Sequence, residues 1–212
     1  MVWYMVLLTA ALSYLIGSIQ TSYIFGKAIK KKDIREYGSG NPGATNAMRV
    51  FGFKFGMVVL LIDALKGALT IVLVKYGFGC TDTALLLLAG IFCIVGHNFP
   101  FYMGFKGGKG VAASLGIILV VDYKVFLFAG ILALISLFAF RIMSIASLVF
   151  EFNTLLGFFL LYMTNNNFFW IIVTAAVYPL MSFYRHRRNL KNLVDGKEKK
   201  LWGEGSEHII PY

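Results

Sequence analysis

Long apolar segments separated by short polar stretches run along the chain as far as residue 184. We count seven, at residues 3–26, 54–76, 84–103, 110–121, 125–140, 142–163 and 168–184. An α-helix needs roughly 17 to 25 apolar residues to cross a bilayer. The pattern therefore predicts an all-α integral membrane protein of about seven transmembrane helices, some of them short or broken.

The segment at 110–121 is the weakest of the seven. It is shorter than a full crossing usually requires, and the polar residues 122–124 separate it from the next segment. Five or six crossings are therefore the alternative. We find no linker, repeat or low-complexity tract, so residues 1–212 are interpreted as one domain that includes a basic tail, 185–212.

Composition supports the membrane interpretation. The chain is 58% hydrophobic with a mean hydropathy of +0.75, whereas soluble domains are about 45–50% apolar. No basic region precedes the first apolar segment, so we expect that segment to stay as a helix and not to be a cleaved signal peptide. Cys80 and Cys93 have neither disulfide-framework nor metal-ligand spacing, and we expect them to be structural.

The net charge of +10 is unevenly distributed. With seven crossings and the N-terminus outside, seventeen Lys and Arg residues fall on the cytoplasmic side, Lys75 and Lys124 fall outside, and Lys66 lies within a span. Short cytoplasmic loops collect Lys and Arg, so this orientation is favoured, with the tail and the glycine-rich loops facing the cytoplasm. We expect membrane lipids as partners and no nucleic acid, because the basic residues flank apolar spans and no aromatic-interleaved polar surface is present.

A glycine-rich polar loop occupies residues 38–46 and is followed by Arg49. Asn-Pro-Gly is a turn sequence, so an ordinary turn is the simple alternative. Nine small or turn-forming residues followed by an arginine favour a loop that lines a ligand. The polar side chains expected to face that ligand are Ser39, Asn41 and Asn46.

A second glycine-rich loop occupies residues 104–110 and contains Lys106 and Lys109. It is not a Walker A sequence, because Met103 and Gly110 stand where that pattern requires Gly and Ser or Thr. We expect a nest of backbone N–H groups, formed by Gly107, Gly108 and Gly110 at the start of the next helix, that holds an anion. The alternative is a loop whose lysines only follow the positive-inside bias.

Charged residues also occur inside the apolar segments. Asp63 and Lys66 are three residues apart on one helix face, and we expect a structural pair that neutralises itself. Glu151 has no obvious partner, and its role is left open. No carboxylate cluster accompanies the loops, so neither a metal nor a cofactor is predicted.

The candidates for acid–base chemistry are His97, His186 and His208, of which His186 lies in the basic stretch after the last span. Nearby arginines are expected to lower the pKa of His186 and keep it neutral, as a base requires. On a continued helix, Asn189 faces the same side as His186. There is no Gly-x-Ser-x-Gly elbow and no His followed five residues later by Asp, so any substrate should arrive already activated.

These segments resemble the bacterial membrane glycerol-3-phosphate acyltransferases that use acyl phosphate as donor. The resemblance covers nearly the whole chain and is carried by five signatures, at Ser13–Thr21, Asp33–Asn46, Gly96–Pro100, Phe105–Val111 and the end pattern His186, Asn189, Gly196 and Glu198. Two positions depart from the family pattern: Gln20 stands where Pro is frequent, and Ala113 where Thr is frequent.

The resemblance implies transfer of a fatty acyl group from acyl phosphate to the 1-hydroxyl of glycerol 3-phosphate, giving lysophosphatidic acid and inorganic phosphate at the bacterial inner membrane. It implies no covalent acyl-enzyme, a substrate contact for Ser144, whose ordinary role would be a bond to its own helix, and a structural role for Glu198. The residues expected to bind substrate or serve catalysis are Ser39, Arg49, Gly107, Gly108, Lys109, Gly110, His186 and Asn189.

Three questions stay open at this level. The proton acceptor is either His186 or a phosphate oxygen of a bound substrate. A transporter or exchanger of a small phosphorylated metabolite is the alternative function, because loops that break helices beside cations also suit a midplane binding site. A binding protein for anionic lipid is a third interpretation, and it explains the tail but not the loops. Oligomeric state is not predicted.

Overall fold

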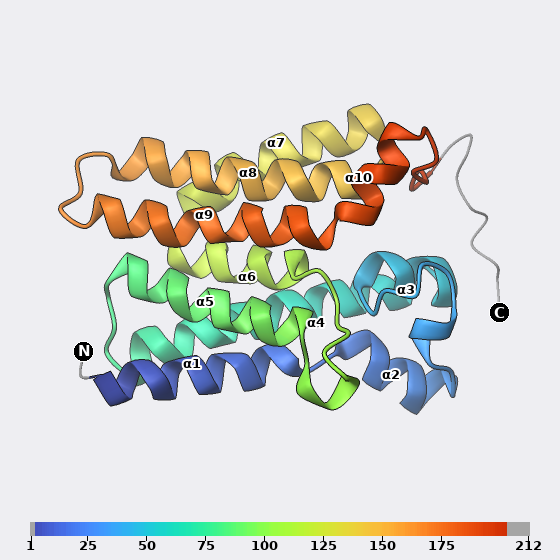
Figure 1. The fold of residues 1–212 in the computed structure, drawn as a ribbon, viewed down its shortest axis with the longest axis horizontal. Coiled ribbons are helices and arrows are strands. Elements are labelled where there is room, and N and C mark those ends of the chain that lie inside the picture. Colours follow the sequence, from blue (N-terminus) through green and yellow to red (C-terminus); the bar gives the residue numbers. More distant parts are fainter. Residues whose placement is uncertain (1–2, 203–212) are drawn as a thin grey trace.

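The computed structural model describes residues 3–202, and His208 lies outside the described residues. The chain in this range is helical, as predicted (Figure 1). The α-helices are α1 (Trp3–Ser18), α2 (Thr21–Lys30), α3 (Ala44–Phe51), α4 (Phe53–Val72), α5 (Thr83–Asn98), α6 (Val111–Val121), α7 (Tyr123–Phe140), α8 (Met143–Tyr162), α9 (Phe168–Arg185) and α10 (Arg187–Val194).

Six helical segments of the described chain are long and apolar enough to cross a membrane: Tyr4–Lys30, Phe53–Gly77, Thr83–Met103, Tyr123–Phe140, Met143–Tyr162 and Phe168–Arg185. The helix α6 is a shorter apolar helix of 11 residues. The predicted all-α membrane fold is therefore confirmed, with α6 as the short seventh helix.

The first span differs from the single helix expected at 3–26. It breaks at Ile19 and Gln20 and continues as α2 to Lys30. The break is held by groups distant in sequence: the Gln20 backbone N–H donates to the Tyr102 hydroxyl (3.1 Å), and the Gln20 side chain donates to the backbone oxygen of His97 (2.7 Å). A continuous apolar run gives no sign of such contacts.

The short α6 fits because it packs closely on α4. A Cβ atom at Gly116 would lie 1.8 Å from the backbone oxygen of Ala64, and one at Gly67 would lie 2.2 Å from that of Ala113. Only glycine allows the two backbones to approach this closely. After α6, the Asp122 side chain accepts hydrogen bonds from two N–H groups in the first turn of α7 (2.8 and 3.2 Å), so the polar interruption seen in the sequence is a helix cap.

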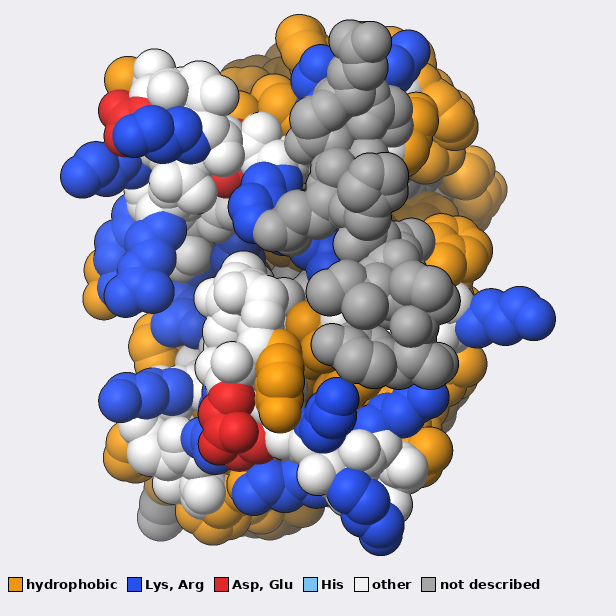
Figure 2. Space-filling view, turned by 90° about the vertical axis from the view of Figure 1, so that its right-hand side faces the viewer, with side chains coloured by type: hydrophobic (Ala, Val, Ile, Leu, Met, Phe, Trp, Pro, Cys, Tyr) orange, Lys and Arg blue, Asp and Glu red, His pale blue; other side chains and the backbone are white. Residues whose placement is uncertain are grey.

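The helices form two groups, with α1–α5 on one side, α7–α9 on the other, and α6 between them (Figure 1). At one end of the molecule, opposite the start of α1, lie α2, α3 and α10, and the beginning of α6 is directed toward this end. Seen from this end, Lys and Arg side chains gather on the surface and few acidic ones accompany them (Figure 2). Both glycine-rich loops and the basic stretch that follows α9 therefore meet at the same end of the bundle.

Candidate active site

The second glycine-rich loop is fixed against the end of α5. The N–H groups of Gly107 and Gly108 donate to the backbone oxygens of Asn98 and His97, both at 3.1 Å. A Cβ atom at Gly107 would lie 2.1 Å from the His97 oxygen, so glycine is needed for this contact. The prediction of an anion-binding nest is therefore wrong for these two N–H groups, because they already donate to carbonyl oxygens of α5.

The carbonyl groups of the same loop are held from α9. The Arg185 guanidinium donates to the backbone oxygen of Gly107 (2.7 Å) and twice to that of Gly108 (2.7 and 3.0 Å). The sequence predicted Arg185 only as part of the basic stretch that follows the last span. Its place directly before His186 is the one sequence signal that separates it from the arginines that follow.

The start of α6 keeps the anion-binding geometry expected there. Gly110 caps the helix with φ of 90°, a conformation that favours glycine. Within the described chain, the backbone N–H groups of residues 109–113 have no hydrogen-bond partner. Unpaired N–H groups and the helix dipole attract a negative charge at this position. The nest is thus shifted toward Lys109 and the first turn of α6.

A chain of hydrogen bonds brings four predicted residues together. The ammonium of Lys109 donates to the side-chain oxygen of Asn189 (2.5 Å), and the Asn189 side-chain nitrogen donates to Oε1 of Glu198 (2.6 Å). The same carboxylate oxygen accepts from the Ser144 hydroxyl (2.8 Å). Glu198 was expected to be structural, and the structure places it in direct contact with two of the predicted site residues.

The cations of this cluster are only partly solvated. Burial lowers the pKa of Lys109 to about 8, against the opposing effect of the Glu198 carboxylate, and the cations Arg49 and Arg185 lower it further. Burial also lowers the pKa of Arg49, again opposed by Glu198. Among the described residues, the Arg49 guanidinium has no hydrogen-bond partner. Two cations are therefore held beside a single carboxylate, which suits the binding of an anion.

His186 lies buried at the junction of α9 and α10. Its Nδ1 is 2.9 Å from the backbone oxygen of Ser182, and a carbonyl oxygen can only accept a hydrogen bond, so the proton lies on Nδ1. Burial, followed by the nearby Lys109 charge, lowers the pKa of His186 to about 3. The ring is thus neutral near pH 7, as expected, and its Nε2 carries a lone pair.

The first glycine-rich loop is held by Asn46, which is buried. Its side-chain oxygen accepts from the N–H of Ser39 (2.9 Å), and its side-chain nitrogen donates to the backbone oxygens of Tyr37 (3.1 Å) and Ile34 (3.4 Å). The Asn46 amide therefore shapes the loop, whereas the sequence suggested that it faces a ligand. Ser39 is exposed, and its hydroxyl oxygen lies 3.5 Å from the backbone N–H of Asn41.

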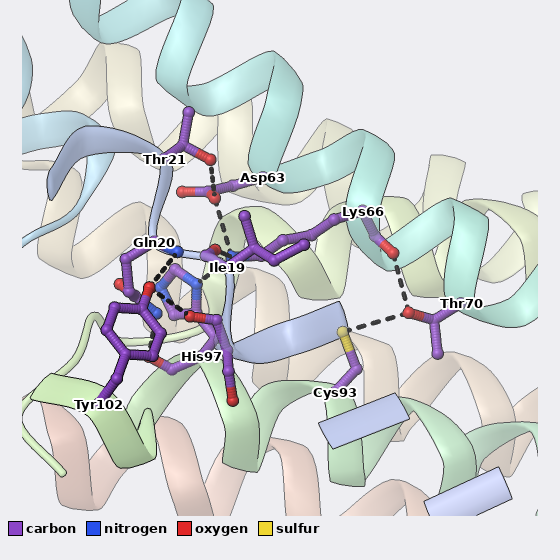
Figure 3. A network of polar contacts seen from close by, with 10 residues as sticks. Ile19, Gln20, Thr21, Asp63, Lys66, Thr70, Cys93, His97 and Tyr102 are labelled. Carbon is purple, nitrogen blue, oxygen red and sulfur yellow. Dashed lines mark hydrogen bonds and ion pairs between the residues drawn. The ribbon is translucent and has the colours of Figure 1, made fainter. Parts of the chain in front are cut away.

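Among the described residues, no hydrogen bond joins the charges within the spans to this cluster. Asp63 and Lys66 form an ion pair (2.9 Å) that also includes His97 of α5 (Figure 3). Glu151 is buried, and its Oε2 has no hydrogen-bond partner in the described residues. Cys80 and Cys93 are free and buried. No group of three or more metal-ligating His, Cys, Asp or Glu side chains occurs within residues 3–202.

The spans and this cluster together define a multi-pass integral membrane protein with a cationic site at one end of its helix bundle. The chain matches the family model for glycerol-3-phosphate acyltransferase over residues 7–196. A glycerol-3-phosphate acyltransferase of Halalkalibacterium halodurans is 40% identical over 189 residues, which are 89% of this chain and 92% of that protein. One of Listeria welshimeri is 40% identical over 196 residues, which are 92% and 96% of the two chains.

Solved structures agree. The crystal structure of PlsY, an integral membrane glycerol 3-phosphate acyltransferase, in its glycerol 3-phosphate form has a TM-score of 0.83 and 34% identity, covering 93% of this chain and 96% of that one. Its lysophosphatidic acid form has a TM-score of 0.79 and 33% identity, covering 92% and 94%. The chain therefore belongs to the glycerol-3-phosphate acyltransferase family and is an acyltransferase.

Proposed function

We propose that this protein transfers a fatty acyl group from acyl phosphate to the 1-hydroxyl of glycerol 3-phosphate, at the cytoplasmic face of the bacterial inner membrane. The observation that carries the proposal is the pair of partly buried cations, Arg49 and Lys109, beside the unpaired N–H groups of α6. Related proteins are named for acylating glycerol 3-phosphate, and one has been solved with glycerol 3-phosphate and with lysophosphatidic acid. Both of those ligands carry a phosphate group.

In the proposed reaction, the hydroxyl oxygen attacks the acyl carbonyl carbon. The bond from that carbon to the phosphate oxygen then breaks, and its electron pair leaves with the phosphate. Arg49, Lys109 and the start of α6 would stabilise the negative charge that gathers on the leaving group. An activated donor needs no covalent intermediate, which agrees with the exposed position of Ser39 and with its hydroxyl lying beside a backbone N–H instead of a base.

The proton of the attacking hydroxyl is assigned to a substrate phosphate oxygen. A histidine with a pKa of about 3 is a weak base, whereas a phosphate monoester has its second pKa near 6. The lone pair on Nε2 of His186 would accept a hydrogen bond from the hydroxyl and orient it. His186 would then position the nucleophile, and the phosphate would take the proton.

The decisive experiment is acyl transfer by the purified protein in detergent. Labelled glycerol 3-phosphate is supplied with palmitoyl phosphate and, in separate reactions, with acyl-carrier-protein or coenzyme A thioesters. Lysophosphatidic acid from palmitoyl phosphate alone would establish the donor. Product from a thioester instead would refute the donor assignment, and binding of glycerol 3-phosphate without any product would favour a transporter.

A further inference from the structure

A buried polar network joins the break between α1 and α2, the start of α2, α4 and α5 next to the glycine-rich loop (Figure 3). The ammonium of Lys66 has three acceptors: Oδ1 of Asp63 (2.9 Å), the backbone oxygen of Ile19 (2.5 Å) and Nδ1 of His97 (2.8 Å). Asp63 also accepts from the Thr21 hydroxyl (2.8 Å). Every N–H of the ammonium is therefore used, and no charge of the pair is left without a partner.

Lys66 fixes the protonation of the His97 ring. A lysine ammonium has no lone pair and can only donate, so Nδ1 of His97 is the acceptor. A neutral imidazole carries its one proton on the other nitrogen, which is Nε2. That nitrogen faces the loop, since a Cβ atom built on Gly108 would lie 2.0 Å from it. The ring of His97 thus packs directly against the glycine backbone.

His97 also bonds to the loop through its backbone. Its carbonyl oxygen accepts from the N–H of Gly108 (3.1 Å) and from the Gln20 side chain (2.7 Å). From α9, Arg185 donates to the backbone oxygens of Gly107 and Gly108. The loop is therefore held by hydrogen bonds to both α5 and α9. These bonds fix the two residues that directly precede Lys109.

Stability alone is a weak reason for such a network. Charges inside a membrane span are expensive and mark function more often than structure. Replacement of a buried ion pair by uncharged residues is frequently neutral or stabilising. A network that fixes the position of a phosphate-binding loop would contribute to catalysis, because a misplacement of about 1 Å can cost on the order of 100-fold in rate.

We propose that His97, held by the Asp63–Lys66 pair, is a positioning residue that sets the backbone of Gly107 and Gly108 and thereby the placement of Lys109 for a substrate phosphate. This role differs from the self-neutralising structural pair that the sequence suggested. Because the inference rests on the proposed function, the wild-type protein must first show acyl transfer from palmitoyl phosphate. Without that activity the proposed function fails, and the inference fails with it.

The test uses the double variant Asp63→Asn with Lys66→Met, which removes both buried charges and leaves an acceptor for Thr21. We expect it to fold with a Tm close to that of the wild type, and to lose about 10- to 100-fold in kcat/KM, mostly as a higher KM for the phosphorylated substrates. A second variant, His97→Phe, should show the same shift of KM. Wild-type KM values in a folded double variant would overturn the proposal.

Thr70→Val is the matched control. The Thr70 hydroxyl lies in the same network, donating to the backbone oxygen of Lys66 (2.9 Å) and contacting the sulfur of Cys93 (3.5 Å), but no hydrogen bond joins it to the loop. We expect its KM values to equal those of the wild type. Equal changes in KM for Thr70→Val and the double variant would contradict positioning. So would a failure of both the double variant and His97→Phe to fold, because the network would then serve folding alone.

Discussion

Substitution of Lys109 by Met, with Lys106→Met as its control, separates phosphate binding from simple charge bias. Both lysines lie in the same glycine-rich loop. Lys109 is half-buried and bonded to Asn189, whereas Lys106 is exposed. If the loop charges only follow the positive-inside bias, the two variants should behave alike. If Lys109 binds a substrate phosphate, Lys109→Met alone should impair the enzyme.

The magnitude follows from the kind of contact. A hydrogen bond to a charged group contributes about 1.5–3 kcal/mol, and about 1.36 kcal/mol corresponds to a tenfold change. The expected loss in kcat/KM for Lys109→Met is therefore roughly 10- to 160-fold. Lys106→Met should change it less than about twofold, as expected for an exposed charge.

The assay is the initial rate of lysophosphatidic acid formation in detergent. Palmitoyl phosphate and glycerol 3-phosphate are varied in turn, so that the substrate whose KM rises identifies the phosphate that Lys109 contacts. Thermal unfolding of each variant shows whether the fold is kept. Indistinguishable kinetics for the two lysine variants, both folded, would refute a direct role for Lys109.

The pH profile provides a second measurement on the same residue. Burial lowers the pKa of Lys109 to about 8 from its ordinary 10.5, so the cation is present below that pH and is lost above it. We expect kcat/KM of the wild type to fall as the pH rises through about 8. Lys109→Met should lack this decline, and a decline that persists in the variant would assign it to another group.

Three further predictions concern other residues. Burial holds the pKa of His186 at about 3, so the pH profiles of kcat/KM for the wild type and His186→Ala should not differ by an inflection near pH 6.5. An inflection there that is present in the wild type and absent from His186→Ala would identify His186 as the base. Mass spectrometry of protein quenched during turnover should find no acyl group on Ser39, and a stoichiometric adduct there would disprove direct transfer. Gly116→Ala should destabilise the protein by about 1–3 kcal/mol through its clash with the backbone of Ala64. Gly130→Ala, with open space around it, should not lower the Tm.

Much of the fold could be predicted because membrane spans are long and apolar. The segments at 54–76 and 142–163 match α4 and α8 to within a residue or two, apart from the π-helical turn Leu73–Gly77 that ends the second span. The break at Ile19 and Gln20 could not be predicted, since its stabilising partners, Tyr102 and His97, come from the far end of α5 and just beyond it. Local propensity contains no information about such long-range hydrogen bonds.

The site was partly predictable for a similar reason. Charge asymmetry alone placed both loops and the basic stretch on one face, and the structure brings them to one end of the bundle. The hydrogen-bond acceptors of the Gly107 and Gly108 N–H groups could not be predicted. A glycine-rich sequence indicates that backbone N–H groups are accessible, but it does not identify the groups to which they donate. Arg185 was missed because, in sequence, only its place directly before His186 separates it from the exposed Arg187 and Arg188.

The way each cation is held bears on how the site would act on a phosphate. Arg185 is already bonded to two loop carbonyls, so its charge serves to build the loop. Lys109 is held by the neutral amide of Asn189, and the Glu198 carboxylate lies one hydrogen bond further away. A direct ion pair would have neutralised Lys109, whereas the amide fixes its position and leaves its charge available. Fixed donors stabilise a developing negative charge without reorganising.

Asn189→Asp should therefore impair the enzyme even though it preserves the size of the side chain, since it places a carboxylate against Lys109. A kcat/KM equal to that of the wild type in Asn189→Asp would refute this account of the site.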